Sequence, residues 1–193
     1  MWGPPVSARA DRPEARCPPP LGAFRSEVLR LEEVPLPAPG PGEVLIRTRA
    51  LGLNRAESMF RLGQYGIDPV FPSGIGYEAA GVIEALGEGV SGLSVGEAVS
   101  VVPSFAMTDY PMHGEAVLAP ADAVVAHPER LSDDRRRADA VAFVHDGLAK
   151  GELTPVIDKT FPLEAIADAY RYLEAGGQVG KIVIGVDQHG DRS

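Results

Sequence analysis

The sequence contains very little cysteine and no excess of basic residues. Cys17 is the single cysteine among 193 residues, which excludes a disulfide framework and a thiolate metal cluster. Acidic residues outnumber basic ones by 27 to 18, which gives a net charge of −9. Nucleic acids and anionic membranes attract clustered Lys and Arg, so we expect neither as a partner. The lone thiol fits a reducing, cytoplasmic setting.

Long apolar runs are also missing. No run approaches the length of a membrane span, and the first 20 residues carry three arginines without the apolar segment of a secretory signal. Six prolines in that stretch predict a disordered, Pro-rich arm over residues 1–22. We expect a second disordered segment at the other end, over residues 188–193.

Glycine and proline are abundant, with 22 and 18 residues, and favour many turns between short strands. Side chains alternate in character from Glu43 to Leu51, which is the period of a strand. We expect further strands at residues 76–86, 97–102, 115–118, 154–158 and 181–186, a strand or hairpin within 23–34, and helices at 54–62, 134–150 and 162–175. Several short strands joined by turns suggest a small, strongly bent barrel or a pair of sheets.

The hexapeptide GEGVSG, with Gly87, Gly89 and Gly92, matches the G-x-G-x-x-G pattern of dinucleotide-binding loops. That pattern holds a pyrophosphate only where it turns a strand into a helix, whose free N–H groups then face the phosphates. The residues that follow, LSVGEAVSVV, have strand alternation. The hexapeptide is therefore predicted to be a turn between two strands, and the sequence contains no other phosphate-binding loop.

Two blocks of the sequence together carry a family resemblance. The first, within residues 40–132, runs from PGEVLIRTRALGLNRAE to GYEAAGVIEALGEGVSGLSVGEAVSV. The second, residues 146–186, includes FPLEAIADAYRYLEAGGQVGKIV. In this order they resemble the medium-chain dehydrogenase/reductase superfamily, specifically its zinc-free, quinone-oxidoreductase-like branch.

The resemblance implies a fold. In that family a nicotinamide-binding Rossmann domain lies between the two blocks, whereas here they join directly, with the insertion missing near residues 132–138. What is left would be a single catalytic domain over residues 23–187. We therefore expect a mixed α/β, mainly β structure: a GroES-like bent antiparallel barrel with flanking C-terminal helices and no Rossmann domain.

The resemblance also bears on metals and cofactors. Zinc-using relatives have a Cys at the position of Asn54 and a His-Glu pair at the position of Tyr77-Glu78. Zn²⁺ needs three or four N, S or O ligands, and Asn54 and Tyr77 are poor substitutes. The four histidines are scattered along the chain. We expect no metal and no cofactor.

The same resemblance places a set of polar groups at the substrate cleft, namely Asn54, Tyr65, Tyr77, Glu78, Asp109, Tyr110 and His113. An amide, phenols, an imidazole and carboxylates can polarise a carbonyl group and move a proton. Structural roles stay open for several of them. Asn54 could cap a helix, Tyr65 could be a packing aromatic, and Glu78 could pair with an arginine. His113 could be an ordinary loop residue.

Four functions remain open from the sequence. The favoured one is a cofactor-independent cyclase, isomerase or lyase that reuses the old substrate cleft on a polyketide-like or enone compound, within a biosynthetic pathway. The second is a binding or assembly protein, in which a homodimer or a full-length relative covers the apolar wall that the Rossmann domain would have covered. The third is an NAD(P)H-dependent oxidoreductase whose cofactor is held by a partner. The fourth is a remnant without activity.

Overall fold

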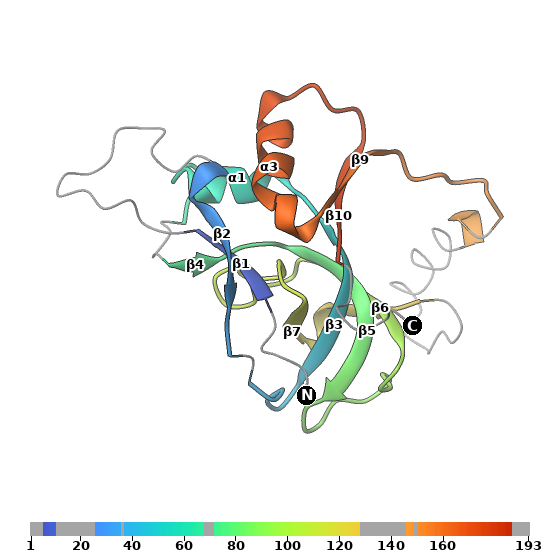
Figure 1. Cartoon of the computed structure of the whole chain (residues 1–193). Coiled ribbons are helices and arrows are strands. Elements are labelled where there is room, and N and C mark those ends of the chain that lie inside the picture. The colour runs from blue at the N-terminus through green and yellow to red at the C-terminus, as the bar shows by residue number, and fades with distance from the viewer. Residues whose placement is uncertain are drawn as a thin grey trace, which may run out of the picture.

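The computed structural model describes residues 6–10, 26–35, 37–67, 72–127, 146–148 and 150–186. They form two sheets with short helices beside them (Figure 1). The smaller sheet has the order β2-β1-β4, with β1 (Val6–Ala10), β2 (Leu29–Glu33) and β4 (Ser73–Gly74). The larger sheet has the order β8-β6-β5-β3-β10-β9, and β7 also pairs with β3. Its strands are β3 (Glu43–Gly52), β5 (Glu78–Leu86), β6 (Ala98–Val101), β7 (Ala116–Pro120), β8 (Val124–Ala126), β9 (Ile157–Pro162) and β10 (Lys181–Gly185).

Strand β3 joins the first sequence block to the second. One of its edges pairs with β5, while the other pairs with β7 over residues 43–47 and with β10 over residues 50–52. Two register shifts in the β3–β5 ladder bend the pair, as bulges do. Among the described residues, the parallel pairing is that of β9 with β10, and the other pairs are antiparallel. The predicted bent antiparallel barrel and mainly β fold class are confirmed.

The predicted disorder of residues 1–22 is wrong for residues 6–10, which form β1. All five residues pair with β2, and Arg9 and Ala10 also pair with β4. The prolines of the arm flank this pentapeptide and none lies within it, so every residue keeps the backbone N–H that a ladder requires. Composition over a 20-residue window therefore concealed a short segment able to form a strand.

The helices begin and end close to the predicted residues. Helix α1 (Arg55–Arg61) follows Asn54, whose backbone is extended as an N-cap requires. Helix α3 (Ile166–Ala175) begins later than predicted, because Pro162 ends β9 and residues 163–165 form a 3₁₀ turn. Gly176 ends α3 with a φ of 74°, a left-handed conformation that glycine adopts without strain.

Some predictions lie outside the described residues. They include most of the predicted helix over 134–150, the junction near 132–138 and the segment 188–193. In the part of the chain that is described, no helix is long and apolar enough to cross a membrane.

Helix α3 lies against α1 at one end of the barrel (Figure 1), and polar groups connect the two helices. Glu57 on α1 has no exposure to solvent, and its carboxylate accepts hydrogen bonds from the Asn54 N–H (2.8 Å), the Tyr77 N–H (3.0 Å) and the Tyr170 hydroxyl (2.8 Å). Arg61, also fully buried, pairs with Glu174 on α3. A buried carboxylate is costly unless hydrogen bonds replace its water, and here these three donors do so together with the more distant Asn54 Nδ2, at 3.4 Å.

We predict that Tyr170→Phe lowers the free energy of unfolding by about 1–3 kcal/mol, because it removes one donor from a buried carboxylate. Tyr172→Phe is the matched control on the same helix, since its hydroxyl donates to Asp158 at 2.7 Å in an exposed position. Urea unfolding followed by circular dichroism measures both. Equal losses for the two variants would contradict the role given to the buried hydroxyl.

Candidate functional site

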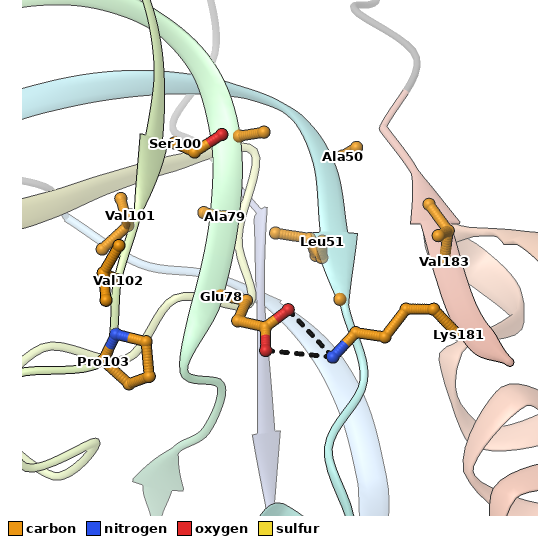
Figure 2. A pocket seen from close by; sticks show the side chains of 12 residues that line it. Ala50, Leu51, Glu78, Ala79, Ser100, Val101, Val102, Pro103, Lys181 and Val183 are labelled. Carbon is orange, nitrogen blue, oxygen red and sulfur yellow. Dashed lines mark hydrogen bonds and ion pairs between the residues drawn. The ribbon is translucent and has the colours of Figure 1, made fainter. Parts of the chain in front are cut away.

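A cavity of about 380 Å³ opens between β3, β5, β6 and β10. Small and apolar side chains make most of its wall, and Glu78 and Lys181 are its charged groups (Figure 2). The residues that line it are Ala50, Leu51, Gly52, Glu78, Ala79, Ala80, Ser100, Val101, Val102, Pro103, Lys181 and Val183. An apolar cavity with a few convergent polar groups is the usual form of a small-molecule site.

The ammonium group of Lys181 is held by two side chains. It donates to Asn54 Oδ1 at 3.0 Å and to Glu78 Oε1 at 3.0 Å, and Glu78 Oε2 lies 2.9 Å away. Lys181 comes from β10, Glu78 from the start of β5, and Asn54 from the turn after β3. Figure 2 shows the lysine reaching past the end of β3 to the carboxylate. Both charged side chains are about one third exposed, so the pair is accessible from the cavity.

Gly52 makes room for this pair. A Cβ atom at this position would overlap Glu78 Oε2 and lie within 2.7 Å of Lys181 Cε. Glycine at the end of β3 thus allows two charged side chains to meet directly over the backbone.

Tyr65 and Tyr77 belong to a row of aromatic rings, not to the lining of this cavity. Ring centroids are 6.2 Å apart between Tyr65 and Tyr77, 6.5 Å between Tyr77 and Phe105, and 5.6 Å between Phe105 and Tyr110. Burial and the hydrogen bond to Tyr65 raise the pKa of Tyr77 to about 12. The Tyr77 phenol therefore stays protonated at neutral pH and can donate a hydrogen bond.

Asp109 and Tyr110 line a second cavity of about 530 Å³ near Glu43. The Tyr110 hydroxyl donates to Glu43 Oε1 at 2.8 Å, and this bond raises the pKa of Tyr110. The Gly40 N–H, followed by the Tyr110 hydroxyl, lowers the pKa of Glu43. Asp109 is exposed. The structure therefore separates these two predicted residues from the pair formed by Glu78 and Lys181.

His113 is fully buried next to the polar contacts of Glu57. Its Nδ1 lies 3.3 Å from the Tyr170 hydroxyl, and its Nε2 lies 3.7 Å from Glu57 Oε1. Burial lowers the pKa of His113, an effect that the nearby Glu57 carboxylate opposes. A neutral imidazole without solvent access is placed to support the structure.

Of the seven predicted residues, the structure brings Asn54 and Glu78 together around the Lys181 ammonium, and Glu78 lines the cavity. Sequence reasoning missed the residue that joins them, Lys181, which it treated only as the start of the last strand. An arginine partner for Glu78 was an open possibility from the sequence; the structure pairs Glu78 with Lys181 instead. The buried Glu57 was missed too, although its place three residues after Asn54 is that of a capping-box carboxylate.

Residues 55–184 match the family model described as "Zinc-binding dehydrogenase". The chain is 36% identical over 134 residues to the synaptic vesicle membrane protein VAT-1 homolog of Rattus norvegicus, covering 68% of this chain and 32% of that protein. It is 34% identical over 118 residues to a quinone oxidoreductase of Sus scrofa, covering 61% of this chain and 35% of that one. This chain therefore spans about a third of the length of these relatives.

Solved structures agree on the fold. A quinone oxidoreductase from Coxiella burnetii superposes with a TM-score of 0.76 at 16% identity, covering 95% of this chain and 99% of that one. The human synaptic vesicle membrane protein VAT-1 homolog-like protein superposes with a TM-score of 0.74 at 16% identity, covering 97% and 99%. These likenesses support the predicted GroES-like arrangement.

The description of the family model raises the question of zinc, and the residues at this site do not fit it. Within the described ranges, no group of three or more His, Cys, Asp or Glu residues is arranged to hold a metal ion. Asn54 Oδ1 and Glu78 Oε1 each accept a hydrogen bond from the Lys181 ammonium at 3.0 Å, so the oxygens that could bind Zn²⁺ already face a positive charge that would repel the ion.

The glycine-rich hexapeptide does not have the setting of a pyrophosphate-binding loop. The hexapeptide from Gly87 to Gly92 lies in the connection between β5 and β6, so it joins two strands as predicted. A pyrophosphate cradle requires the turn to open a helix.

We predict that stability falls as the pH drops below 6.5, in part because of His113. Its ordinary pKa is 6.5 and burial lowers it, so the unfolded chain takes up a proton before the folded chain does. The contribution of neutral His113 to stability is complete above pH 6.5. It is lost as the pH falls toward the lower pKa of the folded state, and the free energy of unfolding then drops by up to about 1.4 kcal/mol per pH unit. Urea unfolding at pH 7.5 and 5.5 tests this.

In that experiment His113→Asn should show a smaller loss between the two pH values than the unmodified chain. His127→Asn, where the ring contacts Ser100 in an exposed position, is the control and should keep the full loss. An unchanged loss in His113→Asn would rule out the assignment.

Proposed function

This chain belongs to the zinc-binding dehydrogenase family of the medium-chain dehydrogenase/reductase superfamily, and from that premise we propose that it performs cofactor-independent proton transfer on a carbonyl compound. The reaction class is that of a cyclase, isomerase or lyase. Its substrate is a small enone or polyketide-like molecule bound in the cavity beside Glu78.

The observation that carries this proposal is a carboxylate and an ammonium group 2.9 Å apart at the edge of an apolar cavity. A carbonyl compound fits such a place because its carbon skeleton can lie on the apolar wall while its oxygen meets a hydrogen-bond donor. A volume of about 380 Å³ is in the range of small-molecule sites.

Glu78 is the proposed base. Its carboxylate takes a proton from the carbon next to the carbonyl group, and the electron pair of the broken C–H bond forms a C=C bond. The π electrons of the carbonyl group move onto its oxygen, which becomes an enolate oxygen. The protonated Glu78 then returns the proton to another carbon of the enolate, so that the double bond has moved and no electron acceptor is needed.

A second candidate is NAD(P)H-dependent reduction of a quinone or enone, with the cofactor held by a partner. The similarity to proteins named quinone oxidoreductase favours it, including one of Pseudomonas aeruginosa that is 43% identical over 74 residues, or 38% of this chain and 22% of that protein. The apolar cavity beside Glu78 suits the substrates of this reaction as well. The two candidates differ in whether turnover requires a nicotinamide.

The remaining expectations stand as part of the proposal. The partner is a small-molecule substrate, with neither nucleic acid nor membrane involved, and the protein works in the cytoplasm within a biosynthetic pathway. A homodimer is the expected assembly if the chain serves as a binding protein. Exposed Val156, Ile157 and Val179 at the β9 side of the sheet are apolar groups that such a contact would cover.

We predict that Glu78→Gln slows proton exchange on a bound enone by about 10²–10⁴-fold, because it removes the base. The measurement is hydrogen–deuterium exchange at the carbons beside the carbonyl group of cyclohexenone in D₂O, followed by NMR without NADPH. Glu84→Gln is the matched control, since Glu84 lies on the same strand and pairs with Arg47 at 2.7 Å. Exchange or turnover that appears only when NADPH is added would favour the reductase instead.

A further inference from the structure

Lys181 supplies the positive charge at this site. Its ammonium group touches an amide oxygen and a carboxylate from two other elements, at 3.0 Å each. The resemblance to the family places a zinc-binding Cys at Asn54 in zinc-using members, so the lysine charge lies against a residue at a metal-ligand position. The sequence pattern alone did not indicate that a lysine ammonium would lie beside this position.

The backbone around Lys181 fixes where its side chain begins. The Lys181 N–H donates to the Val156 carbonyl at 2.8 Å, and β10 pairs with the end of β3 immediately beyond it. Gly52, at that end of β3, leaves space for the side chain to cross toward Glu78. The lysine is thus directed at the cavity by two strands and held there by two acceptors.

We propose that the Lys181 ammonium is the electrophile of the site and takes the role that a metal ion has in zinc-using relatives. It binds the oxygen of a carbonyl compound and stabilises the negative charge that develops when the enolate forms. This inference rests on the proposed function, since it names the group that stabilises the charge created by Glu78.

An ammonium group is suited to this role because it has three N–H donors. Two donate to Asn54 Oδ1 and Glu78 Oε1, and the third can serve a ligand oxygen that replaces the contact with Glu78 Oε2 at 2.9 Å. A fixed positive charge beside a developing oxyanion is among the largest contributions to catalysis, since the charge needs no reorientation during the step. The ammonium keeps its proton throughout, so the proton balance of the reaction involves Glu78 alone.

The test uses p-nitrophenol, whose anion carries its charge on an oxygen attached to a flat ring, as an enolate does. Absorbance of the anion gives the pKa of the bound probe in the whole chain. We expect binding to lower this pKa, because the ammonium favours the ionised form. Lys181→Met should raise the pKa of the bound probe by about one unit or more, a tenfold shift in ionisation. Lys150→Met, at an exposed lysine outside the cavity, should leave it unchanged.

Two further variants test whether the pKa of the bound probe follows the charge at the site. Glu78→Gln removes a negative charge next to the ammonium and should lower the pKa of the bound probe further. Lys181→Arg keeps the charge and should retain a measurable part of the shift. A probe pKa that Lys181→Met leaves unchanged would overturn the proposal.

A metal is tested in the same assay. Extensive dialysis against EDTA should not alter the shift, and added Zn²⁺ should not bind at one equivalent by isothermal titration calorimetry. Stoichiometric zinc binding together with a shift that requires zinc would overturn the inference. If the pKa shift of the probe depends on Lys181 but the protein catalyses no proton exchange on an enone, this inference stands and the proposed function is removed. Proton exchange on the enone that persists in Lys181→Met, together with a probe pKa that this substitution leaves unchanged, would overturn this inference and leave the proposed function standing.

Discussion

The structure depends on one buried carboxylate, that of Glu57. It joins the start of α1, the segment before β5 and the C-terminal helix α3, because each of these supplies at least one of its hydrogen bonds. Through the Asn54 N–H it also fixes the residue that holds the Lys181 ammonium. The fold and the candidate site are therefore connected through a group that never meets solvent.

Much of the fold could be predicted because its signals are local. Alternation along β3 and the N-cap at Asn54 are properties of neighbouring residues, and the structure confirms both. Strand β1 was missed because prolines on either side dominated the local composition, while its pairing with β2 depends on a segment farther along the chain. The late start of α3 has the same origin, since pairing with β10 keeps Pro162 in a strand.

The candidate site was harder to predict because its contacts are not local. Lys181 and Asn54 are 127 residues apart in the sequence, and no spacing rule links them. The family resemblance pointed to the positions of Asn54 and Glu78, but it did not indicate that the Lys181 ammonium would bind to both of them. Tyr65, Tyr77 and Tyr110 were grouped with these residues by the resemblance, and they form an aromatic row outside the cavity that Glu78 lines.

The position of β10 has a consequence for how the chain is made. This strand pairs with the end of β3, yet it lies far later in the sequence and is therefore synthesised long after β3. Until then β3 presents unpaired backbone groups and apolar side chains, which is the condition in which nascent β proteins associate wrongly. The end of β3 therefore lacks its β10 partner until that later segment has been made, and this edge is open to wrong pairing during that interval.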